Sequence, residues 1–237
     1  EERIAERIDA NLLNISMEDL HMLNRKLFND KITNLQSKTT GTLIIKEYPT
    51  ASAHTGHIRT LVNELALKRT FKPDIIFVDY INICASARFR PGSNVNSYTY
   101  IKAIAEEMRG LAVELDLPIV TATQTTRTGF VSSDIGLEDT SESFGLPATA
   151  DFMFALISSE ELERAGQMLV KQLKNRYNDP TLNRKFIIGV DRARMKLFDI
   201  EQAAQNLIQP EEEKYVEHNL EKETPEEKYK KFQDFKF

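Results

Sequence analysis

Two short apolar runs, at 74–79 and 118–123, constrain the fold of this chain more than any other feature. Each follows or contains a proline at its start and is filled with aliphatic residues, which is typical of a strand buried on both faces. A segment with helical periodicity lies between them and ends near Leu115. Strand, helix and strand at this spacing predict a right-handed βαβ unit, whose two strands are parallel neighbours.

The residues ahead of this unit predict mainly helices. Apolar spacing indicates a helix over about 1–13, and a second helix begins at Ser16, which is a suitable capping residue. The buried face of that second helix would consist of three leucines, Leu20, Leu23 and Leu27. A strand is predicted at 42–46, followed by a helix that ends near Lys68. Because the first helix has no capping residue before it, we expect the sequence to begin inside a longer domain.

The residues behind the unit predict an antiparallel meander and a tail. The strand segments are 151–158, 167–173, 185–190 and 193–200. The first domain would therefore cover residues 1–208, with a charged C-terminal tail over 209–237 that is poor in aliphatic residues. The fold class predicted is α/β: a mostly parallel sheet flanked by helices, with antiparallel strands on its C-terminal side.

Composition excludes several classes of protein. No apolar run among the 237 residues approaches the ~20 residues that span a bilayer. The net charge of −5 excludes a globally basic coat for nucleic acid, although it allows a locally basic loop or channel. The single cysteine, Cys84, fits a reducing compartment, and we expect a cytoplasmic protein.

Polar side chains follow both central strands where chemistry is expected. Asp79 ends the first strand and Gln124 ends the second, and ligands of parallel sheets bind outside the carboxyl ends of the strands. An apolar strand that ends in Asp is the Walker B pattern, which holds Mg²⁺ and its water shell in nucleotide hydrolysis. The matching phosphate cradle, G-x-x-x-x-G-K-[ST], does not occur in the sequence. Either the fold does not bind nucleotide, or the cradle lies upstream of Glu1, as the uncapped first helix favours.

Four segments in the same order resemble a known family. They are Phe77-Val78-Asp79-Tyr80-Ile81-Asn82, Thr123-Gln124-Thr125-Thr126-Arg127, Asp139-Thr140-Ser141-Glu142-Ser143 and Lys174-Asn175-Arg176. Together they resemble the DnaB-type, RecA-like hexameric replicative DNA helicases over about residues 1–208. The stretch from Ser143 to Asp151 is most similar to the replicative helicases of T-even-like phages.

The resemblance implies roles for individual residues. Asp79 would hold Mg²⁺ through water, and Gln124 would link the γ-phosphate of ATP to the DNA-binding loops. Lys174 and Arg176 would reach the nucleotide of the neighbouring subunit, as a piston and an arginine finger, because cations stabilise charge on the transferred phosphoryl oxygens. Without the resemblance, the same two cations would simply be solvated at a hairpin tip.

The resemblance also implies a surface for single-stranded DNA. Its candidate residues are Arg88, Arg90, Arg127, Ser141, Glu142 and Phe144. Ser141 stands where the family has Arg, so one phosphate contact is weakened and backbone amides would carry more of the binding. Phe144 stands where the family has Gly, and it would either stack on a base or be a buried anchor.

The function implied is that of a replicative helicase motor domain with ATP and Mg²⁺ as cofactors. Its partners would be single-stranded DNA and five further copies in a hexamer, with a primase and a helicase loader as further candidates; a phage-encoded protein would act in the host cytoplasm. By the same alignment the phosphate loop and the catalytic glutamate precede Glu1, so this chain alone should not hydrolyse ATP. Two alternatives stay open: a RecA-like or KaiC-like ATPase of recombination or signalling, and an interaction module that kept the fold and lost the nucleotide.

Overall fold

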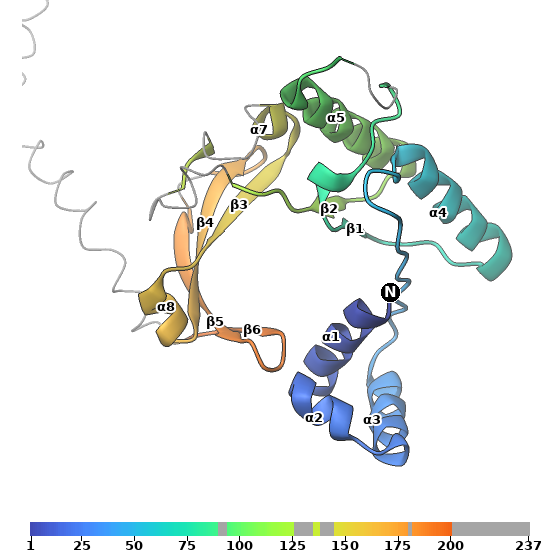
Figure 1. Cartoon of the computed structure of the whole chain (residues 1–237), viewed down its shortest axis with the longest axis vertical. Coiled ribbons are helices and arrows are strands. Elements are labelled where there is room, and N and C mark those ends of the chain that lie inside the picture. The colour runs from blue at the N-terminus through green and yellow to red at the C-terminus, as the bar shows by residue number, and fades with distance from the viewer. Residues whose placement is uncertain (90–93, 126–134, 138–144, 180–181, 201–237) are drawn as a thin grey trace, which may run out of the picture. The chain divides into compact units, whose positions relative to one another are not determined.

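The computed structural model describes residues 1–89, 94–125, 135–137, 145–179 and 182–200 (Figure 1). Contacts divide the chain into two units, Glu1–Phe198 and Asp199–Phe237. All the elements below belong to the first unit, apart from the last residue of β6. The predicted tail at 209–237 lies outside the described residues.

Three helices open the chain: α1 (Glu2–Leu13), α2 (Met17–Met22) and α3 (Arg25–Lys38). The predicted cap of α2 is confirmed, since the Ser16 hydroxyl accepts the backbone N–H of Asp19 at 3.0 Å. The single long helix predicted after Ser16 is wrong. Asn24 caps a new helix by accepting the N–H of Leu27 at 2.9 Å, which breaks the expected leucine face and leaves Leu27 exposed.

The next helix, α4, covers Thr55–Arg69 and confirms the helix predicted there. The strand predicted at 42–46 is wrong, because these residues form no strand pairing. Ile44 and Ile45 instead line a cleft with Leu61 and Leu65 of α4. Residues whose sequence pattern is typical of a strand thus line a cleft beside a helix.

The predicted βαβ unit is present as parallel strands β1 (Ile76–Val78) and β2 (Ile119–Thr121) with α5 (Ser97–Leu115) between them in sequence. Ile76 lies opposite Ile119 in the register. A short 3-10 helix, η1 (Ile81–Ile83), follows β1. The prediction that β1 is buried on both faces is wrong in this chain: Phe77 is 70% exposed. Neighbouring strand residues point to opposite faces, and Val78 packs against the α5 core on the other one.

The second sheet is the predicted antiparallel meander, in the order β3-β4-β5-β6. Its strands are β3 (Phe152–Ile157), β4 (Gln167–Asn175), β5 (Lys185–Asp191) and β6 (Lys196–Asp199). The short helix α7 (Gly145–Thr149) precedes β3, and α8 (Glu160–Arg164) connects β3 to β4. The described chain thus combines a parallel and an antiparallel sheet with helices, as the α/β class requires.

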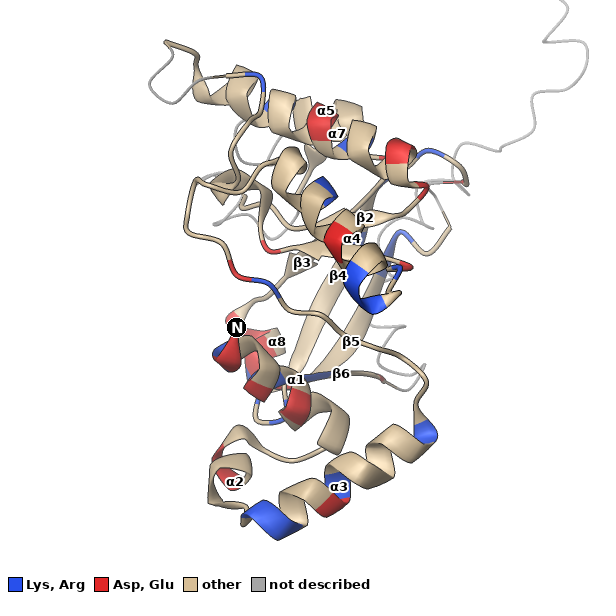
Figure 2. Cartoon of the chain, turned by 90° about the vertical axis from the view of Figure 1, so that its right-hand side faces the viewer, with Lys and Arg blue, Asp and Glu red and all other residues tan. Residues whose placement is uncertain are grey.

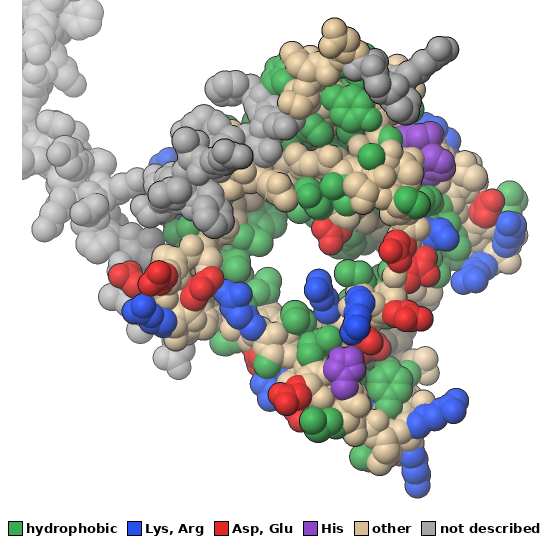
Figure 3. Space-filling model, viewed as in Figure 1, with side chains coloured by type: hydrophobic (Ala, Val, Ile, Leu, Met, Phe, Trp, Pro, Cys, Tyr) green, Lys and Arg blue, Asp and Glu red, His purple; other side chains and the backbone are tan. Residues whose placement is uncertain are grey.

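The strand β3 has one covered and one open face. Ala155 and Ile157 are buried with Ile135, whereas Phe152, Phe154 and Leu156 are each about half exposed. These three residues are called the β3 apolar strip below. Hydrophobic side chains over this sheet are visible at the surface in Figure 3.

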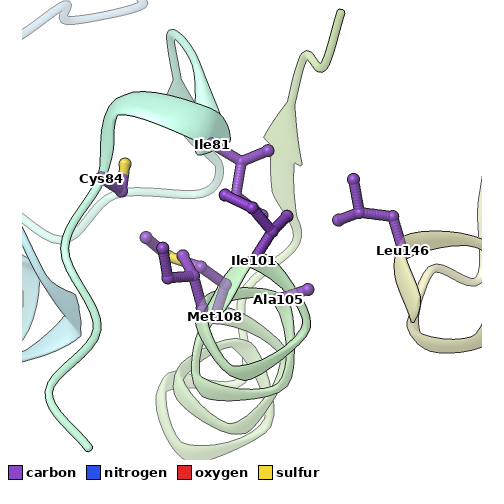
Figure 4. Close-up of a cluster of buried hydrophobic side chains, with 7 residues drawn as sticks. Ile81, Cys84, Ile101, Ala105, Met108 and Leu146 are labelled. Carbon is purple, nitrogen blue, oxygen red and sulfur yellow. The ribbon is translucent and has the colours of Figure 1, made fainter. Parts of the chain in front are cut away.

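The larger core cluster surrounds α5 (Figure 4). Its members are Ile81, Cys84, Ile101, Ile104, Ala105, Met108 and Leu146. Each large side chain buried here stabilises the fold by about 1.5–3 kcal/mol. Leu146 attaches α7 to α5, and Ile81 attaches the segment after β1, so the core positions both.

Membrane insertion by a helix finds no support. Within the residues that the structure describes, no helix combines the length and the apolar character needed to cross a bilayer.

Candidate functional site

The carboxyl ends of β1 and β2 lie side by side and are joined by side-chain hydrogen bonds. The Thr121 hydroxyl donates to the Val78 carbonyl at 2.8 Å, and the Thr123 hydroxyl donates to Asn82 at 2.9 Å. The Gln124 amide donates to the Tyr80 hydroxyl at 3.2 Å. Gln124 is therefore bonded to the residue directly after Asp79, and the predicted neighbourhood of the two strand ends is confirmed.

Asp79 presents an exposed carboxylate at this edge. None of the residues in the described ranges forms a hydrogen bond or ion pair with it. No group of three or more His, Cys, Asp or Glu that would hold a metal directly occurs in the described part either. A single free carboxylate fits Mg²⁺ that keeps most of its water shell, since this ion dehydrates reluctantly and accepts one or two protein carboxylates.

Lys174 and Arg176 lie at the end of β4, and their side chains turn onto the last residues of α7. The Lys174 ammonium donates to the Pro147 carbonyl, and the Arg176 guanidinium donates to the Ala148 carbonyl at 3.1 Å. Arg176 also forms an ion pair of 2.9 Å with Asp151. The two cations are therefore held within their own chain, which differs from the solvated hairpin tip that their sequence position suggests.

Arg109 of α5 completes this group. Its guanidinium donates to the Thr149 carbonyl at 2.6 Å and to Asp151 at 2.7 Å. Together, Arg109, Asp151, Lys174 and Arg176 are called the Asp151 cluster below. Sequence reasoning missed Arg109 and Asp151 as functional candidates, because their pairing joins residues 42 positions apart and follows no local motif.

The charges within the Asp151 cluster shift the pKa values of its members. Partial burial acts to raise the pKa of Asp151, but the hydrogen bond and charge of Arg109, with the charge of Arg176, outweigh it and lower that pKa. Burial, followed by the charge of Arg176, lowers the pKa of Lys174. Asp151 pairs with two of the three cations, Arg109 and Arg176, and the cluster has excess positive charge.

Arg88, a predicted DNA contact, lies against acidic residues of α5. The acidic residues of α5 are coloured red in Figure 2. The Arg88 guanidinium pairs with Glu106 at 2.6 Å, and the Glu107 carboxylate accepts the Ser86 hydroxyl at 2.5 Å and the Ala87 N–H at 2.8 Å. The Glu107 side chain is only 7% exposed. Glu107 therefore anchors the loop that carries Arg88, a role that no sequence motif indicated.

The other predicted DNA contacts are Arg90, Arg127, Ser141, Glu142 and Phe144. All five lie outside the described residues, so their roles stay predictions.

Comparison with known proteins gives the family. The model of the family described as "DnaB-like helicase C terminal domain" matches residues 1–176. A DnaB-like replicative helicase of Enterobacteria phage T4 is 47% identical over 205 residues, which are 85% of this chain and 43% of that protein. The chain thus spans less than half the length of this relative.

Two solved structures share the fold. "The Structure Of A DnaB-Like Replicative Helicase And Its Interactions With Primase" superposes with a TM-score of 0.65 at 17% identity, over 83% of this chain and 48% of that one. A second structure, described as an ATPase domain, gives a TM-score of 0.66 at 16% identity, over 83% of this chain and 69% of that one. These likenesses confirm the RecA-like α/β fold expected from the sequence. With the family match over residues 1–176 and 47% identity to the phage protein, this chain belongs to the DnaB-like helicase C-terminal domain family.

Proposed function

We propose that the protein is the motor of a hexameric replicative DNA helicase, which hydrolyses ATP between subunits and moves along single-stranded DNA. The observation that carries this proposal is the pair of joined strand ends that present Asp79 and Gln124, in a chain of the DnaB-like family. The relative from phage T4, a DnaB-like replicative helicase, supports the same function.

Asp79 and Gln124 would form one side of the nucleotide site. Asp79 would hold the water shell of Mg²⁺, and Gln124 would sense the terminal phosphate through an amide that both donates and accepts. When bound, Mg²⁺–ATP supplies the phosphoryl group and neutralises part of its charge. The hydrogen bond from Gln124 to Tyr80 ties the sensor to the segment after β1. A change at the phosphate would therefore reach that segment directly.

Lys174 and Arg176 would form the other side of the site, on a neighbouring subunit. Two cations at the end of one strand suit the charge that develops on the transferred phosphoryl oxygens. The excess positive charge of the Asp151 cluster supports this role, because an arriving phosphate would balance it. A ring is required for these groups to act, since each site takes residues from two subunits.

The proposed partners follow from the same interpretation. Single-stranded DNA would contact Arg88, Arg90, Arg127 and the segment with Ser141, Glu142 and Phe144, in the centre of the ring. A primase is a further proposed partner, because the DnaB-like replicative helicase among the solved structures was described with its interactions with primase. We also propose a helicase loader and action in the host cytoplasm.

The test uses the full gene product that contains this chain. ATP turnover is measured with and without single-stranded DNA, and unwinding is measured on a forked duplex. We expect DNA-stimulated turnover and unwinding. Arg176→Ala should lower turnover by about 10³-fold, as for other arginine fingers, and Asp79→Asn should abolish it. Arg194→Ala is the matched control, because Arg194 pairs with Asp191 at 2.7 Å in the turn between β5 and β6, away from the Asp151 cluster.

Three results would contradict the proposal. Absence of turnover in the unaltered protein would favour an interaction module that lost the nucleotide. Turnover without unwinding would favour an ATPase of recombination or signalling. If Arg176→Ala and Arg194→Ala change ATP turnover equally, Arg176 is not part of the nucleotide site.

A further inference from the structure

The end of α7 is held by hydrogen bonds from three cations. The carbonyls of Pro147, Ala148 and Thr149 belong to its last turn, where a helix has no further N–H groups to offer. Lys174, Arg176 and Arg109 each donate to one of these carbonyls. The position of α7 and the position of the Arg176 side chain therefore depend on each other.

The start of α7 is fixed by close packing. Leu146 is buried in the core around α5, and a Cβ on Gly145 would lie 2.9 Å from the Lys102 Cβ, so α7 lies closer to α5 there than another residue would allow. The two ends of α7 thus differ in kind. Apolar packing holds the first, and hydrogen bonds from cations to backbone carbonyls hold the second.

Arg176 itself combines a fixed main chain with a side chain that solvent can reach. Its N–H donates to the Asp151 carbonyl at 2.9 Å, at the end of the β3–β4 ladder. Its side chain is 39% exposed, and that of Asp151 is 37% exposed. A phosphate can therefore approach the guanidinium from solvent and compete with the Asp151 carboxylate, without any opening of the core.

We propose that Asp151 and Arg109 are positioning residues for Arg176: in the absence of a phosphate they hold its guanidinium on the end of α7. This inference rests on the proposed function, which gives Arg176 a phosphate to bind. If DNA favours the released position of Arg176, turnover depends on DNA through this one carboxylate.

The test removes the charge of Asp151 in the full gene product. Asp151→Asn keeps an oxygen that accepts from Arg109 but loses the charge that holds Arg176. We expect DNA-free ATP turnover to rise about three- to tenfold, with a matching fall in the ratio of DNA-stimulated to DNA-free turnover. A role of Asp151 in folding alone would lower turnover under both conditions and would not raise either.

Matched variants distinguish the effect of the Asp151 charge from an effect on folding. Asp151→Glu should restore the ratio, and Asp151→Ser, which keeps a hydroxyl acceptor, should behave like Asp151→Asn if the latter does not fold. Glu114→Gln breaks a comparable ion pair, between Glu114 of α5 and Arg59 at 2.6 Å, and should leave turnover unchanged.

The outcomes distinguish this inference from the proposed function. If the unaltered protein shows no DNA-stimulated turnover, the proposed function fails. If it is stimulated, but Asp151→Asn shows unchanged or lower DNA-free turnover, the inference about Asp151 is overturned while the proposed function stands. Failure of Asp151→Glu to restore the ratio would also overturn the inference.

Discussion

At the scale of single residues, the aromatic ring of Phe198 leaves no room for a side chain at Gly189. This glycine lies in β5 opposite Gln167, and a Cβ built on it would overlap the ring of Phe198 in β6. Gly110 is different: it lies in α5, and a Cβ there would meet nothing within 4 Å. The same substitution should therefore have opposite effects at the two positions.

Gly189→Ala is expected to lower the free energy of unfolding by about 1–3 kcal/mol, because the Phe198 ring must shift. Gly110→Ala is expected to raise it by about 0.5–1 kcal/mol, because alanine loses less backbone entropy in a helix. Thermal or urea unfolding of both variants measures the difference. Equal changes in the two would contradict the packing described at Phe198.

At the scale of elements, two histidines cap the start of α4. The His54 Nδ1 accepts the N–H of Gly56 at 3.0 Å, and the His57 Nδ1 accepts the N–H of His54 at 3.3 Å. Their rings lie 4.0 Å apart. The His54 acceptor nitrogen must be unprotonated, so this cap depends on pH. Burial, followed by the charge of His57, lowers the pKa of His54, against a smaller opposing effect of Glu107.

The expected result is a loss of stability in acid. A histidine with a lowered pKa in the folded state contributes its full stability above its ordinary value of about 6.5, and that contribution is lost as the pH falls through the folded value. The melting temperature should therefore fall as the pH drops below about 6.5. His54→Asn keeps a capping oxygen without the titration and should reduce this fall.

His21→Asn in α2 is the control for that measurement. It removes an exposed histidine that caps no helix N-terminus, and the pH dependence should persist. If the melting temperature of His54→Asn also falls in acid as it does in the unaltered protein, the cap of α4 does not titrate.

Local signals predicted those elements whose partners lie close in the sequence. The βαβ unit and the meander were predicted because hydrophobic period and turn residues act over a few positions. The break at Asn24 was missed, although asparagine is a good cap, because the leucine spacing continues across it. The segment 42–46 has the composition of a strand, but it forms no strand pairing and lines a cleft beside α4. Pairing between distant segments is not visible in a sequence.

The same limit applies to the candidate site. Asp79 and Gln124 were found because each ends a strand, and topology then places strand ends together. The partners of Lys174 and Arg176 were not found, since α7, Arg109 and Asp151 come from separate parts of the chain. Glu107 shows no signal at all: only its burial against Ser86 and Ala87 identifies it.

At the scale of the whole molecule, the proposed function assigns the two sides of the site to different subunits. Within the described ranges, the side chain of Arg176 contacts Asp151 and α7, and no hydrogen bond or ion pair joins it to Asp79. Each site would take Asp79 from one subunit and Arg176 from the next. A ring assembled from Asp79 variants and Arg176 variants would then contain some sites in which both residues are intact.

Mixing two inactive proteins tests this arrangement. Asp79→Asn and Arg176→Ala proteins, combined in equal amounts and allowed to exchange subunits, should regain ATP turnover, because about a quarter of the interfaces in random rings are intact. Each protein alone should stay inactive. A mixture no more active than its components would place both residues in the same subunit's site.

The β3 apolar strip has a practical consequence for anyone who purifies this chain by itself. Two phenylalanines and a leucine lie half exposed on the outermost strand of a sheet, which is where one molecule most readily adds to another. Sulfate and similar salts strengthen the burial of apolar surface. Such salts would therefore stabilise the core of the isolated chain and also promote its precipitation through this strip. Dilute solutions of low ionic strength should keep it dispersed.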